Sequence, residues 1–472
     1  MKKYRLLLVF LAGLTLGLII REAPLYLLHQ QIQATHDYWV YAPDEQRNWS
    51  LNDWRVFTPA PVRFLIPYHG DLLVVTGIYG GVYSLEKHEW LLKYDKWFDT
   101  FDYKYIAGNG LDVLLIAGYD SPYILKYDGR SFKWVKTPSP PVAITRPYGF
   151  AEETTKEDCY FLAGNGYIYY YNPRDDRIEE RKAKLPVPWE RWSGFGAVGL
   201  GGKAYFADSH PVDQGGGIYQ YDPAADTLTR VYSGRIVALQ EGHAGNYIAL
   251  EEALNGKQSR IVWTRDFSTF KVFILPESDH FRRGVYEFGS SPNIIRGDER
   301  DFVFSRNILY AIGYVPYYPI PWAQPSISPL FGSPIFIQDM APYRNAIAVA
   351  FAGTYKGDRY YSTVSLMPPY SLMDMKLPPA TAVIWDSTKV SAGEVSLPVI
   401  TAGWRKFIIF FTSDTPGDLV IQVDLDGSGM FEDYLIRANV TREFLTMDGH
   451  FAMMRLKFSS GATVTAKLSM AP

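Results

Sequence analysis

The sequence has a single cysteine in 472 residues, Cys159, which excludes an internal disulfide. Cys159 stands in the apolar run DCYFLAG, a pattern that predicts a buried strand. A free cysteine in such a run behaves as a small apolar side chain. We therefore interpret it as a buried strand thiol rather than as a catalytic nucleophile.

The chain also lacks an excess of charge of one sign. Its formal net charge is −3 at pH 7, and the charges are spread along the sequence without a basic stripe. A protein that binds nucleic acid usually carries such a stripe to meet the phosphates. Nucleic acid is therefore not expected as a partner.

Several catalytic motifs are missing as well. The sequence contains no Gly-x-Ser-x-Gly, no phosphate-binding loop, no HExxH and no paired-cysteine metal motif. These motifs carry the nucleophiles and metal ligands of several common enzyme classes. We leave open whether the protein is an enzyme, but the sequence favours a protein that is not one.

Aromatic residues are abundant. The chain has 35 Tyr, 27 Phe and 12 Trp, an aromatic share of 16%, together with 39 Gly and 31 Pro. This combination favours short aromatic strands separated by turns. The length predicts two or three domains.

Residues 1–22 have the layout of an export signal. Lys2, Lys3 and Arg5 precede the uncharged, mostly apolar run 6–20, and no convincing small-x-small cleavage site follows it. A cleaved signal peptide and an uncleaved membrane anchor both stay open, since the run is short for a full span. We expect an extracytoplasmic protein, secreted or anchored through a hydrophobic N-terminal helix, with residues 23–52 as a stalk.

One kind of apolar run, ending in a small residue and Gly or Asp, recurs along residues 54–379. Its clearest copies are LLVVTG (72–77), VLLIAG (113–118), CYFLAG (159–164) and KAYFAD (203–208), and looser copies follow at 246–252, 301–307 and 346–353. Equivalent positions in successive copies lie 41 to 54 residues apart. We interpret these seven runs as the inner strands of a repeated unit.

The rest of each unit predicts a β-propeller blade. A strand, an Asp- or Asn-led turn and another strand follow each run, as in YIYYYNPRDDRIEE (167–180). Units of about 40 to 50 residues with four strands are typical of blades. We predict an all-β fold with a seven-bladed propeller over residues 53–380, six or eight blades being the alternatives. Residues 53–66 resemble the unit endings, so we expect them to supply the outer strand of the last blade.

The chain resembles the kelch-like and related secreted propellers in general layout only. The Gly-Gly plus Tyr/Trp spacing of kelch repeats and the Trp-Asp ending of WD repeats are absent from the sequence. The stretch TRDFSTF (264–270) resembles the Asp-box turn of sialidases faintly, without its central glycine. No sialidase site is therefore carried over.

The sequence pattern changes over residues 381–472. Seven or eight strand-like runs occur there, and Ile421, Val423 and Leu425 alternate with polar residues. This alternation predicts strands with one buried face, in a β-sandwich or jelly roll. The layout from Phe407 to Gly427 resembles small sandwich domains of phage and virus structural proteins and of cell-surface proteins. That resemblance implies a module that displays or docks other parts.

The richest candidate for chemistry is the loop ADSHPVDQGGG (207–217). Asp208, His210 and Asp213 fall within six residues, and such a set could bind a metal or act as acid and base. The plainer interpretation is that these residues cap turns in a Gly- and Pro-rich loop and face water.

Other loops offer candidates for ligand binding. Trp189 and Trp192 flank Glu190 and Arg191, and exposed Trp pairs can stack on sugar rings, although packing between blades explains them as well. Tyr119 and Asp120 lie in GYDSP (118–122), a hairpin loop that we expect at one mouth of the propeller.

The stretch VDLDGSGMFEDYL (423–435) has features of a calcium loop. An EF-hand frame starting at Asp424 places Leu435 where a bidentate Glu is required, and the flanking residues alternate as strands. Asp-Gly and Ser-Gly between two strands indicate a hairpin turn instead. One interpretation of the acids remains: Asp424, Asp426, Glu432 and Asp433 could together bind one calcium ion, and no other cofactor is expected.

Three functions fit the sequence. The first is an exported, surface-exposed binding or structural protein whose propeller and sandwich contact surface or envelope proteins, or glycans. The second is an extracellular propeller enzyme, a hydrolase or lyase acting on polysaccharide. The third is a virus-encoded structural or receptor-binding protein. Fold alone does not choose among them.

Overall fold

The computed structural model describes the following residues: 55–58, 62–77, 80–96, 98–108, 111–119, 121–149, 158–186, 196–242, 245–252, 259–277, 293–296, 301–305, 308–313, 326–332, 337–344, 346–356, 359–367 and 377–472. The expected export signal or anchor (1–22) and stalk (23–52) lie outside these ranges. Within the described ranges, no helix combines the length and the apolar character that crossing a membrane requires.

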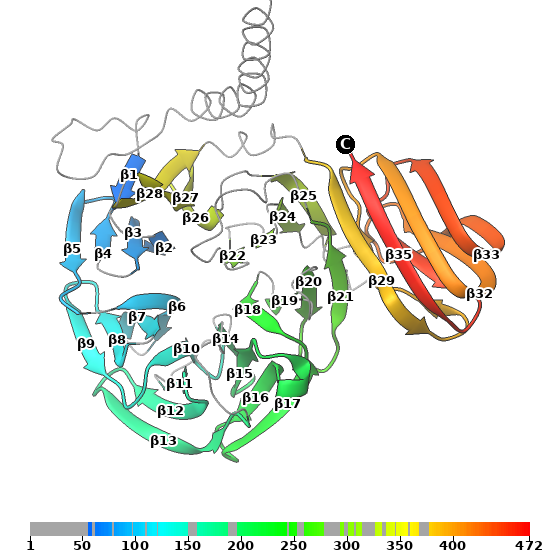
Figure 1. Ribbon diagram of the computed structural model, residues 1–472. Coiled ribbons are helices and arrows are strands. Elements are labelled where there is room, and N and C mark those ends of the chain that lie inside the picture. The colour runs from blue at the N-terminus through cyan, green and yellow to red at the C-terminus, as the bar shows by residue number, and fades with distance from the viewer. Residues whose placement is uncertain are drawn as a thin grey trace, which may run out of the picture.

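Seven antiparallel four-stranded blades, counted in the described part of the chain, form a ring (Figure 1). Six of them are separate sheets, and the fifth continues into the strands of the C-terminal unit. The first four blades are β2 (Val62–Tyr68), β3 (Asp71–Thr76), β4 (Gly81–Ser84) and β5 (Glu89–Lys93); β6 (Asp99–Gly108), β7 (Leu111–Tyr119), β8 (Tyr123–Tyr127) and β9 (Phe132–Lys136); β10 (Pro141–Thr145), β11 (Cys159–Ala163), β12 (Tyr167–Asn172) and β13 (Arg177–Lys184); and β14 (Ala197–Leu200), β15 (Lys203–Asp208), β16 (Gly217–Asp222) and β17 (Thr227–Ser233).

The remaining three blades complete the ring. They are β18 (Ile236–Glu241), β19 (Tyr247–Glu252), β20 (Ser259–Thr264) and β21 (Lys271–Leu275); β22 (Asn293–Arg296), β23 (Asp301–Ser305), β24 (Ile308–Gly313) and β25 (Ser326–Gly332); and β26 (Ile337–Tyr343), β27 (Ala346–Lys356) and β28 (Arg359–Met367) with β1 (Arg55–Thr58). The predicted seven-bladed propeller is thereby confirmed.

Blade seven is closed by the N-terminal strand. β1 pairs antiparallel with β28, from Arg55 opposite Ser365 to Thr58 opposite Ser362. β1 is thus the outer strand of the last blade, as the sequence predicts. Ring closure of this kind leaves no long open sheet edge between the first and last blades.

One strand assignment from the sequence is wrong. The recurring apolar runs form β3, β7, β11, β15, β19, β23 and β27, which are the second strands of the blades. The first strands lie nearest the axis, because they contact one another around the ring, as β2 contacts β26 and β18 contacts β22. The second strands carry the clearer signature because they are covered on both faces, which selects continuous apolar runs over alternation.

Burial falls from the axis outward within a blade. In blade three, all residues of β10 and β11 are buried, β12 is mixed, and the outer strand β13 (RIEERKAK) is mostly exposed. Neighbouring blades pack through apolar clusters, such as the one joining Leu115 of blade two to Phe161 of blade three. Burying such a side chain contributes about 1.5–3 kcal/mol, so these clusters hold the ring together. Cys159 is fully buried in one of them, as predicted.

The C-terminal unit consists of β29 (Ala380–Val390), β30 (Glu394–Val395), β31 (Val399–Ile400), β32 (Lys406–Asp424), β33 (Glu432–Asp448), β34 (Met453–Phe458) and β35 (Ala462–Ala471). The first half of β32 pairs with β35 and its second half with β34, while β33 runs beside both halves. The apolar faces of the two halves meet: the rings of Phe411 and Phe458 lie 5.0 Å apart. The unit is therefore a large C-terminal sheet built on one long bent hairpin.

This unit is joined to the outer edge of blade five. β31 pairs in parallel with β21, where Ile274 N–H donates to the carbonyl of Pro398 at 2.8 Å. Glu277 and Thr381 exchange two backbone hydrogen bonds of 2.8 Å. The fully buried Trp404 donates its indole N–H to the carbonyl of Pro378 at 2.9 Å. Figure 1 shows the unit outside the ring, with β32 and β33 on the side away from the propeller.

Candidate functional site

Asp208 and His210 are brought together at the end of β15. Asp208 is the last residue of that strand and is fully buried. Its Oδ1 accepts a hydrogen bond from the His210 backbone N–H at 2.9 Å and lies 2.7 Å from the His210 ring Nδ1. A carboxylate at Nδ1 fixes the orientation of an imidazole and leaves Nε2 on the opposite side of the ring. Two of the three residues predicted from this loop therefore form a pair.

Burial and hydrogen bonding act on the Asp208 carboxyl in opposite directions. Burial raises the pKa of Asp208, against hydrogen bonds from His210 that lower it. Its second oxygen, Oδ2, is buried and has no hydrogen-bond partner in the described part of the chain. The turn around the pair is tight, since a Cβ on Gly216 would lie 1.8 Å from the His210 carbonyl oxygen. The pair is thus held rigidly in a compact loop.

Asp213 does not join this pair. It lies on the 3-10 helix Val212–Gln214 and is exposed to solvent. Across the described ranges, no group of three or more His, Cys, Asp and Glu side chains is placed to hold a metal ion. The arrangement provides a base, His210, and its orienting carboxyl, Asp208.

Charged residues of blade five lie beside this loop and were not predicted. Arg235 donates from Nε to the Ser209 carbonyl at 3.1 Å and pairs with Glu252 at 3.2 Å. Glu251 accepts from the Tyr232 hydroxyl at 2.9 Å and lies 3.6 Å from Arg260. Arg235 therefore ties the loop after β15 to the end of β19. The sequence signal was the acidic pair Glu251-Glu252 at a strand end, but nothing local indicated its cationic partners.

A second buried carboxyl lies next to the axis and was also missed. Asp339 of β26 accepts the backbone N–H of Leu65 at 2.7 Å through Oδ2 and that of Met340 at 2.8 Å through Oδ1. Burial raises the pKa of Asp339 to about 7, although both hydrogen bonds lower it. Leu65 belongs to β2, so this side chain joins blades seven and one. Its role is to close the ring.

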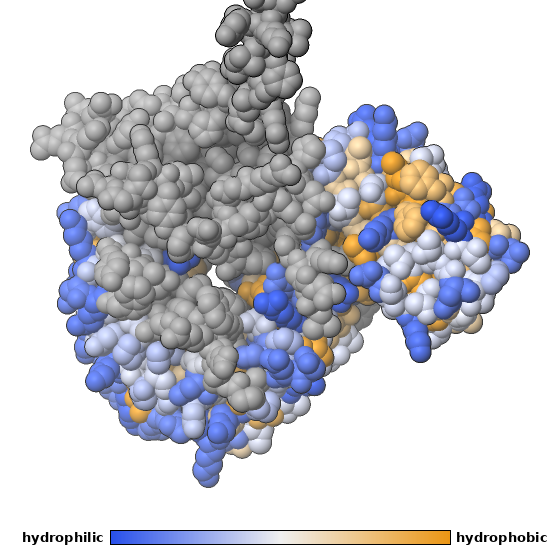
Figure 2. Space-filling view, in the orientation of Figure 1, coloured by the Kyte–Doolittle hydropathy of each residue, from blue (hydrophilic) through white to orange (hydrophobic). Residues whose placement is uncertain are grey.

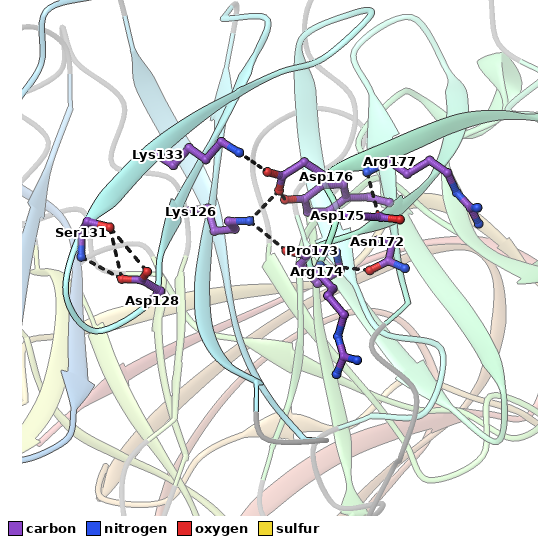
Figure 3. A network of polar contacts seen from close by, with 11 residues as sticks. Lys126, Asp128, Ser131, Lys133, Asn172, Pro173, Arg174, Asp175, Asp176 and Arg177 are labelled. Atoms are coloured by element: carbon purple, nitrogen blue, oxygen red, sulfur yellow. Dashed lines mark hydrogen bonds and ion pairs between the residues drawn. The ribbon is translucent and has the colours of Figure 1, made fainter.

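A polar network links the outer hairpins of neighbouring blades. Asp176, in the β12–β13 turn at φ 57°, binds Lys126 Nζ at 2.6 Å and accepts from the Tyr171 hydroxyl at 2.8 Å. Figure 3 shows Lys126 and Lys133, from β8 and β9 of blade two, both pointing at this carboxylate of blade three.

The same tie recurs one blade further on. Asp226 lies in the β16–β17 turn at φ 51° and accepts from the Tyr221 hydroxyl at 3.0 Å. Arg181 of blade three donates to that hydroxyl at 2.9 Å. The turns between the third and fourth strands of these blades are thus also contact points between blades.

The side chains of the other residues predicted to bind a ligand lie outside the described part of the structure. Trp189, Trp192 and Asp120 lie outside the described residues, and Tyr119 ends β7 with only its backbone described. Their role in ligand binding stays a prediction.

The hairpin reading of VDLDGSGMFEDYL is confirmed. β32 ends at Asp424 and β33 begins at Glu432, antiparallel to it. Asp424 is buried, and its carboxylate accepts the backbone N–H groups of Gly427 at 2.9 Å and Gly429 at 2.7 Å. Asp433 accepts from Gln422 at 2.6 Å. Calcium binding by Asp424, Asp426, Glu432 and Asp433 stays a prediction.

Exposed large apolar side chains gather on the C-terminal unit. Among the described residues, all of them lie between Val395 and Phe444: Val395, Leu397, Ile408, Leu425, Met430, Tyr434, Ile436 and Phe444. Figure 2 shows hydrophobic atoms at the surface of this unit. Exposed apolar groups gathered in one region of a surface are typical of interaction sites.

Strand register arranges part of this surface into a face. Phe410 of β32 lies opposite Phe444 of β33 on one side and Lys467 of β35 on the other, and Val383 of β29 lies opposite Lys467. Ile408 lies two residues before Phe410 on β32, so its side chain is on the same face of the sheet. We call Ile408, Phe410 and Phe444, with the exposed cations Lys406, Arg442 and Lys467, the outer face.

Comparisons with known proteins show likeness at the level of fold. A virginiamycin B lyase from Staphylococcus aureus has a TM-score of 0.45 and 13% identity, over 66% of this chain and 96% of that one. BamB from Moraxella catarrhalis has a TM-score of 0.37 and 10% identity, over 64% and 96%. An extracellular domain from B. thetaiotaomicron has a TM-score of 0.42 and 10% identity, over 71% and 44%. No family model and no curated protein matches the sequence.

Proposed function

We propose that the protein is an exported binding protein whose C-terminal unit contacts other surface or envelope proteins. The observation that carries the proposal is the location of the exposed apolar side chains, all of which, in the described ranges, belong to this unit. Phe444 is 65% and Met430 71% exposed, and large apolar groups at such exposure are stabilised when a partner covers them.

The rest of the fold suits this role. The propeller is closed by β1 and tied between blades by Asp176 and Asp226, so it forms a rigid support. The C-terminal unit is joined to its rim by the pairing of β31 with β21 and by the two backbone hydrogen bonds between Glu277 and Thr381. Export and membrane attachment through residues 1–22 belong to the same proposal and rest on the N-terminal sequence alone.

Site-specific photo-crosslinking in the native envelope tests this proposal. A photoreactive amino acid at position 444 is expected to give discrete crosslinked products, and the same group at Asp386, exposed on β29 outside the apolar surface, is the control. The products at 444 should disappear when Ile408 and Phe410 are changed to Ser. Equal labelling at both positions, or none at 444, would contradict the proposal.

One observation favours an enzyme as the second candidate. The Asp208–His210 pair has the geometry of a general base held by a carboxyl. Hydrolysis of a glycosidic bond uses two carboxyl groups about 5 to 10 Å apart, however, and Asp213 is exposed on its own. Screening the wild-type chain and Asp208→Ala against polysaccharides distinguishes the candidates, since turnover lost in the variant would establish catalysis.

A further inference from the structure

Two exposed apolar patches of the C-terminal unit carry charge of opposite sign. The outer face presents three cations, Lys406, Arg442 and Lys467, all exposed and without an ion pair among the described residues, beside one acid, Asp448. The second patch is the tip of the β32–β33 hairpin, where Leu425 is 61% and Met430 71% exposed. The exposed acids Asp426, Glu432 and Asp433 lie within three residues of one or the other of these two in the same hairpin. We call these five residues the hairpin tip.

The two patches cannot cover each other within one chain. The outer face lies on the first half of β32, residues 406–412, whereas the tip follows the last residue of that strand, Asp424. The strand bends between them, and its two halves pack through their opposite, apolar faces. Both patches therefore point away from the unit's core. Figure 1 shows the hairpin on the side of the unit away from the propeller.

We propose that the hairpin tip of one copy binds the outer face of a second copy. Met430 and Leu425 would be covered by Phe444, Phe410 and Ile408, while Asp426 and Glu432 meet Lys467 and Arg442. Each contact covers one patch of each kind, the tip of one copy and the face of the other. It also brings opposite charges together at the rims of the two patches, which favours association and sets its orientation. This inference rests on the proposed binding function only in using the same exposed side chains.

A contact between two different surfaces has a defined consequence. Each copy offers one tip and one face, so the association is head-to-tail and continues into a ring or an open chain. The cationic outer face of a partner copy would attract the acidic tip. An anionic membrane surface would repel it. Arg455, which lies over Phe431 at 4.0 Å on the side of the hairpin, leaves the tip acidic overall.

Complementation between two variants tests the proposal. The full-length chain is kept in mild detergent and followed by sedimentation velocity with a fluorescent label. Wild type is expected to form dimers and larger species as its concentration rises, and salt should weaken them. Phe444→Ser removes the face and Met430→Ser removes the tip, so each variant alone should be monomeric, with association weakened about tenfold or more. Mixed in equal amounts, they should form a dimer and nothing larger.

The matched control is Ile436→Ser. Ile436 is 56% exposed on the same strand as Phe444 but lies outside both patches, so this variant should associate like wild type. A mixture that stays monomeric, or loss of association in the control, would overturn head-to-tail pairing. A monomeric wild type that still gives crosslinks to another protein at position 444 would also overturn it, while leaving the proposed binding function in place. Crosslinks of twice the chain mass are the result that supports it.

Discussion

Leu65 and Asp339 stand 274 positions apart in the sequence and are joined by a 2.7 Å hydrogen bond from the Leu65 backbone N–H to the Asp339 carboxyl. The bond connects the first strand of blade one to the first strand of blade seven. It places a buried carboxyl at the junction where the ring closes. Ring closure therefore depends on this carboxyl as well as on the pairing of β1 with β28.

Asp339 should make stability fall as the pH rises. Its pKa is raised to about 7 by burial, while an unfolded Asp titrates near about 3.9. Below pH 4 the carboxyl is protonated in both states and has no effect. Between about pH 4 and 7 only the unfolded state releases its proton, so the free energy of unfolding should fall by about 3 to 4 kcal/mol from this group.

Asp339→Asn removes this dependence, because its side chain stays neutral. Denaturant unfolding at a series of pH values should show the variant gaining stability relative to wild type from pH 4 to 8, whatever constant offset the lost acceptor causes. Parallel curves for the two proteins would refute the assignment.

Asp176→Ala should destabilise the propeller by about 2 to 4 kcal/mol. The change leaves Lys126 without its carboxylate, removes an acceptor from Tyr171, and places Ala at φ 57°. Asp175→Ala is the matched control, since Asp175 is the exposed neighbour in the same turn and should cost less than about 1 kcal/mol. Equal losses in the two variants, measured by urea unfolding, would show that the network does not stabilise the fold.

Cys159 should be unreactive in the folded protein. It is fully buried in β11, and burial raises the pKa of its thiol, so little thiolate forms at neutral pH. Ellman's reagent should detect no thiol in the native chain and one per chain in guanidinium. Rapid native labelling would contradict the packing between blades two and three.

Trp404 should stabilise the C-terminal unit, where it is fully buried and bonded to Pro378 at the start of the unit. Trp404→Ala is expected to cost about 3 to 5 kcal/mol, because it empties a buried site and removes the bond to Pro378. Trp404→Phe keeps most of the packing and should cost about 1 to 2 kcal/mol. Leu425→Ala, at an exposed position, should change the free energy of unfolding by less than about 0.5 kcal/mol. A Trp404→Ala variant as stable as wild type would contradict the burial of this side chain in the core of the C-terminal unit.

The blades and the closing strand could be predicted because their signals are local and repeat. Runs such as CYFLAG and turns such as YNPRDD recur in each unit, whatever the distant contacts are. The first strands could not be recognised, because β10 (PVAIT) and β14 (AVGL) are short and share no signature.

Candidate sites could likewise be predicted only where their residues are close in the sequence. Asp208 and His210 are two residues apart, so their pairing follows from a tight turn. Asp339 could not be predicted, since its partner Leu65 is near only after the ring has closed. The exposure of Phe444 depends on which strand lies at the sheet edge, which alternation alone does not determine.

Amide hydrogen exchange of the full-length protein, with and without its native envelope fraction, tests most directly whether the C-terminal unit is the binding surface. We predict that added protection falls on residues 406–412 and 442–448, with the propeller unchanged. Protection confined to the loop 207–217, around Asp208 and His210, would contradict the account and place the binding site on the propeller.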